Sequence, residues 1–298
     1  MNTTSPVVPS VASPRSLWLV FALITTLFWG VWGALIELPE KAGFPATLGY
    51  VVWSLTMIPC AAVALVWSGT KLEHQWKQVG AGMVVGLLGA GGQLILFLAL
   101  RNGPAYLVFP IISLFPVLTV FLAYFLLAER ASRRVWAGVV LSFPAMAMLS
   151  YQPPNAPAGA THQWLPLALA VFVMWAVQAY VMKFSTRMMA SESLFFYMMA
   201  GALVLVPFAL WMTDFSQPVE WGWKGPWAAA LIQSLNAVGA LMLVYALRHG
   251  KAMVVVPMTS LAPVLTVILS LTLYAVLPHP VVAIGLVMAS LAIWLMAE

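Results

Sequence analysis

Charged residues are scarce in this chain: Asp, Glu, Lys and Arg make up 7% of its 298 residues, against 63% hydrophobic residues. A soluble domain carries about 25% charged residues, so the composition excludes a water-soluble globule of this size. Cys60 is the one cysteine, which excludes a disulfide within the chain. Asp214 is the only aspartate, and the four histidines fall in loops or at predicted helix ends. We therefore expect no catalytic pair, no metal site and no cofactor, and the sequence does not predict an enzyme.

Long apolar runs dominate the sequence instead. A membrane-spanning helix needs about 20 predominantly apolar residues, and the chain contains ten such runs. Each run must be helical, because a single span in lipid can satisfy its backbone hydrogen bonds only within itself. The predicted fold class is an all-α integral membrane protein with ten transmembrane helices. The predicted spans are residues 16–38, 45–68, 79–100, 104–127, 133–150, 164–184, 192–213, 225–247, 252–275 and 279–297.

One stretch of the sequence occurs twice. Residues 99–120 align without a gap with residues 246–267, and 14 of the 22 positions are identical. The chain is therefore predicted to consist of two copies of one five-helix unit. The predicted division is a disordered cytoplasmic tail over 1–15, a first repeat over 16–150, an external linker over 151–163 and a second repeat over 164–298.

Lysine and arginine are unevenly divided between the two sides of the predicted membrane. The N-terminal tail and alternate loops hold 10 of the 13 basic residues, and the other side holds Lys41, Arg101 and Lys224. Since basic residues concentrate on the cytoplasmic side, both termini are predicted to lie in the cytoplasm, beneath a bacterial inner membrane. Each copy has an odd number of spans, so the second copy is inverted relative to the first. Inverted repeats are typical of secondary transporters that work by alternating access.

Several motifs resemble the EamA domain, the repeat unit of the drug/metabolite transporter superfamily. They are Gly103-x-Ala105, Pro116-Val-Leu-Thr, Glu129-Arg130 and, in the first span, Phe28-Trp29-Gly30. The resemblance covers the chain from about residue 16 onward. It implies a ten-helix basket whose central cavity is lined by spans 1, 3, 4, 6, 8 and 9, with spans 5 and 10 at the periphery. One departure from the repeat is that Glu129 aligns with Val276 in the second copy.

Polar and indole side chains within the spans are the candidates for a substrate cavity. Gln233 and Asn236 are three residues apart and share one face of their helix. Carboxamides in lipid bond each other, bond a neighbouring helix or line a water-filled cavity, and these alternatives stay open here. Trp29 and Trp175 are equivalent in the two copies, and either line the cavity or pack between helices. The predicted cavity residues are Trp29, Trp32, Gln93, Ser113, Trp175, Gln178, Gln233, Asn236 and Ser260.

Four prolines lie inside the fourth and ninth predicted spans: Pro110, Pro116, Pro257 and Pro263. A proline removes one backbone hydrogen bond and bends a helix. These residues are predicted hinges or gates, with a role in shaping the bundle as the alternative.

Glycines form a small-residue face on the third predicted span. Gly82-x-x-x-Gly86 is followed by Gly89, Gly91 and Gly92. Small residues let two helices approach closely in lipid. Helix packing is the favoured interpretation of this face, and room for substrate is the alternative.

The predicted function is a secondary transporter of small organic metabolites. No charged residue lies within a span away from its ends, so neutral or zwitterionic compounds such as amino acids are the predicted substrates. The expected partners are a small-molecule substrate and the lipid bilayer, without nucleic acid, and the chain is expected to act as a monomer or homodimer. One alternative is a drug efflux pump whose pH dependence requires Glu37. The other is a membrane scaffold or sensor that transports nothing.

Overall fold

The computed structural model describes residues 17–102, 108, 111–112, 115–130, 132–149, 164–262, 265–266, 268–269 and 279–296. Over these residues the chain is helical and contains no strand. Six helical stretches in the described ranges are long and apolar enough to cross a membrane, and two shorter apolar helices accompany them. The all-α prediction is therefore confirmed. The count of ten spans stays a prediction, because parts of the fourth and ninth predicted spans lie outside the described residues.

The first half of the chain contains α1 (Leu17–Leu35), α2 (Glu37–Lys41), α3 (Ala46–Ser68), α4 (Trp76–Asn102), α6 (Phe115–Leu126) and α7 (Arg133–Leu149). The second half contains α8 (Trp164–Ser185), α9 (Ser191–Val204), α10 (Val206–Met212), the π-helical turn η1 (Trp223–Trp227), α11 (Ala228–His249), α12 (Ala252–Thr259) and α14 (Pro280–Met296). Most of the predicted spans that can be compared differ from these helices by only a few residues.

Proline explains the main departures from the predicted spans. The seventh span is divided at Leu205 into α9 and α10, and Pro207 follows the break. The eighth span begins with η1, which contains Pro226. Because a proline has no N–H group, it cannot continue the hydrogen-bond pattern of a helix, so the chain bends at these two places.

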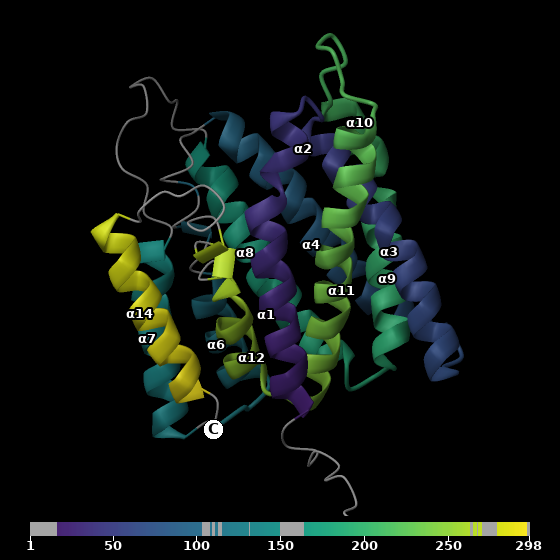
Figure 1. The fold of residues 1–298 in the computed structure, drawn as a ribbon. Coiled ribbons are helices and arrows are strands. Elements are labelled where there is room, and N and C mark those ends of the chain that lie inside the picture. The colour runs from purple at the N-terminus through teal and green to yellow at the C-terminus, as the bar shows by residue number, and fades with distance from the viewer. Residues whose placement is uncertain are drawn as a thin grey trace, which may run out of the picture.

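The helices form one bundle in which α7 and α14 pack against each other at one side (Figure 1). Gly138 of α7 allows this approach, because a Cβ atom there would lie 2.8 Å from Met296 Cγ and 3.0 Å from Ala292 O. The resemblance places spans 5 and 10 at the periphery, and the pair α7–α14 occupies that position.

The first residue of α1 and the last residue of α14 lie at the same end of the bundle (Figure 1). We call this the basic end, because the connections and helix ends here carry Lys71, Arg130, Arg133, Arg134, Arg187, Arg248 and Lys251. Trp18, at the start of α1, and Lys183, near the end of α8, both contact Gly250 in the turn between α11 and α12. The helices α1 and α8 therefore run in opposite directions through the bundle.

The glycine face of α4 packs against two helices. A Cβ atom at Gly82 would lie 2.5 Å from Tyr197 Cβ of α9. A Cβ atom at Gly86 would lie 2.5 Å from Met198 O and 3.0 Å from the Cα of Gly201. Further along, Gly89 and Gly92 contact α8. The packing interpretation of this face is confirmed.

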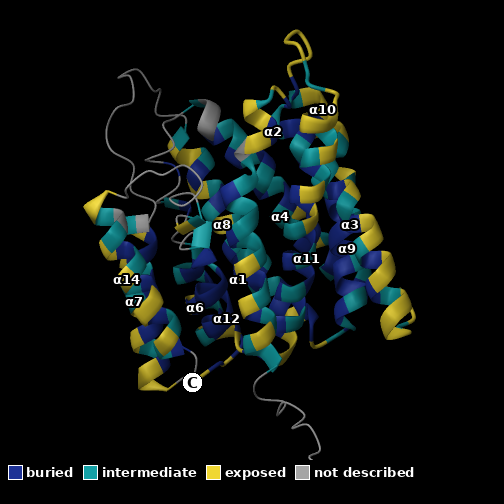
Figure 2. Cartoon of the chain, in the orientation of Figure 1, coloured by how far each residue is buried: buried dark blue, intermediate teal, exposed yellow. Residues whose placement is uncertain are grey.

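Buried residues lie between the helices, while exposed residues cover outward faces such as those of α3 and α14 (Figure 2). Many exposed side chains are large and apolar: Trp67 is 88% exposed, Val66 83% and Val287 71%. Soluble proteins rarely leave so many large apolar groups in water. These faces match the hydrocarbon of a bilayer.

Gly86→Ala is expected to destabilise the protein, because its Cβ atom meets backbone atoms of Met198 that cannot rotate away. The expected loss is about 2 kcal/mol, or about 5 °C in apparent unfolding temperature. The matched control is Gly80→Ala on the same helix, where a Cβ atom would meet nothing within 4 Å. Thermal unfolding in detergent measures both variants. An equal effect of the two substitutions would contradict the packing described for α4 and α9.

Candidate functional site

Trp29 joins α1 to α11. Its Nε1 atom donates a hydrogen bond of 3.4 Å to the backbone oxygen of Asn236. The indole lies on Gly239, where a Cβ atom would be 2.6 Å from both Cδ1 and Nε1. Only glycine leaves room for the ring at this depth. Thr25 also reaches α11, since its hydroxyl donates to Gly239 O at 3.1 Å.

Trp175 makes the same contact between α8 and α4. Its Nε1 atom donates to Gly89 O at 3.2 Å, and its ring lies on Gly92. Offsets of 146 and 147 residues relate Trp175 to Trp29, Gly89 to Asn236 and Gly92 to Gly239. Each repeat therefore sets one tryptophan against a glycine of the other repeat and donates to an equivalent carbonyl.

Two threonines repeat the same relation. Thr119 of α6 donates to Ala176 O of α8 at 3.4 Å, and Thr266 donates to Gly30 O of α1 at 2.9 Å. Thr119 and Thr266 are equivalent at an offset of 147, and Gly30 and Ala176 at an offset of 146. Sequence reasoning did not select these threonines, although both belong to the duplicated Pro-Val-Leu-Thr motif that marks them.

The equivalence ends at the next turn of α1. Trp32 Nε1 donates to Gln233 Oε1 at 2.9 Å. Gln233 is only 6% exposed, and its Nε2 atom lies near Gly49 of α3. The equivalents of Trp32 and Gln233 are Gln178 and Gly86, which cannot form such a pair. Of the three possibilities for Gln233, the structure shows a bond to a neighbouring helix.

Three other predicted carboxamides have no such partner. The side chains of Gln93, Gln178 and Asn236 are half-buried and make no hydrogen bond within the described part of the chain. The amide of Gln178 lies over the backbone of Gly89, and Gln93 follows one turn later on α4. Gln93 and Gln178 thus belong to the α4–α8 contact. Asn236 stands beside Trp29 in the α1–α11 contact.

Of the remaining predicted residues, some lie in the described part of the structure and others lie outside it. Ser260 is half-buried and follows the last residue of α12. Pro116 belongs to α6, and Pro257 lies inside α12. Both prolines are buried. Ser113, Pro110 and Pro263 lie outside the described residues, so the structure does not bear on them.

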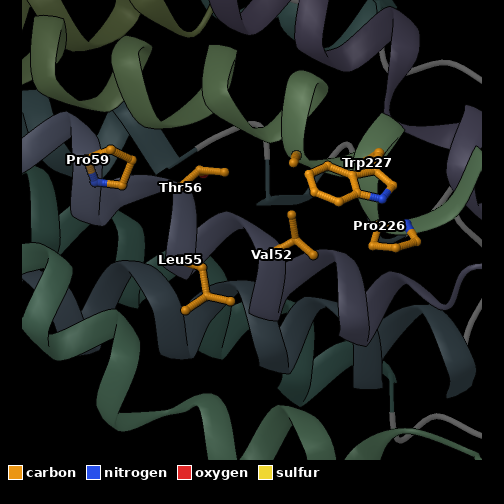
Figure 3. Close-up of a pocket in the computed structure, with 7 residues that line it drawn as sticks. Val52, Leu55, Thr56, Pro59, Pro226 and Trp227 are labelled. Atoms are coloured by element: carbon orange, nitrogen blue, oxygen red, sulfur yellow. The ribbon is translucent and has the colours of Figure 1, made fainter. Parts of the chain in front are cut away.

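Two grooves lie on the outer surface of the described structure. One, of about 390 Å³, runs between α3 and the η1–α11 segment, and is lined by Val52, Leu55, Thr56, Pro59, Pro226, Trp227 and Ala230 (Figure 3). The other is lined by Pro207, Phe208 and Trp211. Both grooves are apolar and contain none of the predicted cavity residues. They suit lipid chains better than a polar substrate.

Polar contacts also gather at the basic end, where sequence reasoning selected no residue. Lys183 is 9% exposed, and its Nζ atom donates to Leu247 O at 2.6 Å and to Gly250 O at 2.5 Å. Arg248 Nη1 donates to Thr186 O and Met189 O at 3.1 and 2.8 Å. Glu129 Oε2 accepts a hydrogen bond of 3.1 Å from Met253 N. The sequence could have pointed to these residues, because charged residues are rare in this chain and each one near a span is therefore a candidate for a specific contact.

No metal centre is indicated by the described residues, because they contain no group of three or more His, Cys, Asp and Glu residues suited to hold an ion. The chemistry of the bundle is that of amides, hydroxyls, indoles and backbone carbonyls. Such groups bind small molecules through hydrogen bonds and apolar contact rather than through covalent steps.

Comparison with known proteins identifies the family. Protein LicB of Haemophilus influenzae (strain ATCC 51907 / DSM 11121 / KW20 / Rd) is 21% identical over 207 residues, which cover 66% of this chain and 69% of that protein. A solved crystal structure shares the fold with a TM-score of 0.77 at 20% identity, covering 95% of this chain and 96% of the other. The EamA-like transporter family matches residues 16–151 and again residues 162–297. The chain therefore belongs to the EamA-like transporter family of the drug/metabolite transporter superfamily.

Proposed function

We propose that this protein is a secondary transporter of small neutral or zwitterionic metabolites, such as amino acids, which works by alternating access across the inner membrane. The observation that carries the proposal is the pair of equivalent contacts, Trp29 on Gly239 and Trp175 on Gly92, that join two copies of a transporter-family repeat. Two equivalent units can exchange conformations, which opens a site between them first to one side and then to the other.

The opposite directions of α1 and α8 support an inverted arrangement of the repeats. Both helices reach the same turn at Gly250, one with its first residues and one with its last. A pseudo-two-fold axis in the membrane plane produces this relation. An inverted pair can form two conformations of similar energy that face opposite sides, as alternating access requires.

The unpaired carboxamides support the substrate class. An amide group without a partner in hydrocarbon is costly, so water or a polar ligand between the helices would stabilise Gln93 and Gln178 at the α4–α8 contact and Asn236 beside Trp29. Amides donate and accept hydrogen bonds without carrying charge. They suit the ammonium and carboxylate of an amino acid, or hydroxyl and amide groups, and they do not balance the charge of a phosphorylated compound.

Gln178→Leu is expected to abolish ligand-induced stabilisation while leaving the unliganded protein folded, because Gln178 makes no hydrogen bond within the described structure. The measurement is thermal unfolding of purified protein with amino acids, sugars, nucleosides and cationic drugs. A ligand that binds the folded state at 100 times its Kd stabilises by about 2.7 kcal/mol. The control is Gln217→Leu, an exposed carboxamide between α10 and η1. Retention of the ligand effect in Gln178→Leu would remove Gln178 from the site.

Trp32→Phe is expected to lower stability by about 2 kcal/mol, since it leaves the buried Gln233 Oε1 without its donor. Trp67→Phe is the matched control, because Trp67 is 88% exposed on α3. Thermal unfolding in the same detergent compares the two variants. Equal unfolding temperatures would mean that the Trp32–Gln233 hydrogen bond does not form in solution.

The orientation of the protein in the membrane can be tested with single cysteines introduced into a Cys60→Ala background. Lys224 and Lys251 are both exposed, on opposite ends of the bundle. Lys224→Cys is expected to react with a membrane-impermeant maleimide on intact cells, and Lys251→Cys only after permeabilisation. The reverse pattern would place both termini outside the cytoplasm.

A further inference from the structure

The helices α6 and α12 meet in the half of the bundle nearer the basic end (Figure 1). These helices belong to different repeats and pack directly against each other. All eight residues of α12 are buried, and Pro116, Thr119, Val120 and Ala123 are buried on α6. Opening of the bundle between the two repeats at this contact would separate α6 from α12.

Glu129 connects the two helices across this contact. It follows α6 in sequence, and its Oε2 atom accepts the hydrogen bond from Met253 N, in the first turn of α12. An unpaired N–H at the start of a helix favours a negative charge. The side chain is only 7% exposed, and its Oε1 atom is buried without a partner among the described residues. A buried carboxylate with one oxygen left without a hydrogen bond is costly unless a positive charge lies nearby.

Lys183, in the second repeat, is a buried cation at the same end of the bundle. Its ammonium group donates hydrogen bonds to the carbonyls of Leu247 and Gly250. Those two bonds join α8 to the end of α11, both within the second repeat. Separation of α6 from α12 would therefore leave Lys183 in place and break the bond between Glu129 and Met253.

The sequence does not repeat these charges at the equivalent positions. At the repeat offsets, Glu129 corresponds to Val276 and Lys183 to Glu37. Valine accepts no hydrogen bond, and an ionised glutamate has no N–H to donate to carbonyls. In a conformation closed at the opposite end, the equivalent helices would meet, but without charges equivalent to those of Glu129 and Lys183.

We propose that Glu129 is a gate residue that holds α6 on α12, and that it makes the conformation closed at the basic end the resting state of the protein. The inference rests on the proposed alternating-access function and names the residue that sets its conformational balance. Several contacts between the repeats have an equivalent in the other copy, whereas the bond between Glu129 and Met253 has none, so it favours the conformation in which it forms.

The test is a distance between spin labels in the full-length Cys60→Ala protein in lipid nanodiscs. Labels at Arg130→Cys and Lys251→Cys occupy exposed positions within two residues of Glu129 and Met253. The parent protein is expected to give one short distance. Glu129→Val, which copies the second repeat, should add a longer distance, with a population ratio changed by about tenfold. Glu129→Gln retains an acceptor without the charge and should give an intermediate ratio.

Glu40→Gln is the control, since Glu40 is an exposed carboxylate at the opposite end of the bundle. It should leave the short distance unchanged. If Glu129→Val does not fold, Glu129→Gln decides, because it preserves the shape of the side chain. One short distance in both Glu129 variants would overturn the proposal. The measurement needs no substrate, so it fails or succeeds independently of the transport assay.

Discussion

Close approach between helices, made possible by glycine, is the constraint on which the rest of this structure depends. In lipid, burial of apolar surface does not drive helices to associate. Close packing and hydrogen bonds between the helices must stabilise the bundle instead. Gly92 and Gly239 each leave space for a tryptophan ring, and the rings reach backbone carbonyls only because of that space. A side chain at either glycine would push the repeats apart.

The duplicated sequence predicts that Trp29 and Trp175 are equivalent, but it does not predict which residues they contact. Trp29 and Trp175 are equivalent by the offset of 146 residues between the two repeats, which can be found from the sequence alone. That they meet Gly239 and Gly92 depends on how helices cross, which no local pattern encodes. The pairing of Trp32 with Gln233 was missed for the same reason: both were assigned to a cavity, and the structure joins them across α1 and α11. The cavity itself stays a prediction.

The two repeats differ at some of the contacts that join them. Two identical repeats would give two conformations of equal energy, with nothing to choose between them. Here Gln233 is paired while its counterpart position is glycine, and Glu129 has Val276 as its counterpart. Charge is scarce in this chain, so the buried carboxylate of Glu129, bonded to Met253 N, is one of few charged groups between the helices. The sequence displayed the mismatch at Glu129, and only the fold reveals that it spans the two repeats.

Flux before and after a reversible cross-link at the basic end tests the account most directly. Cysteines at Arg130 and Lys251, in a Cys60→Ala background, would be joined by a cleavable bis-maleimide in proteoliposomes loaded with a radiolabelled amino-acid mixture. The account predicts that exchange stops when the basic end is held closed and returns when the linker is cleaved. Exchange at an unchanged rate through fully cross-linked protein would contradict it.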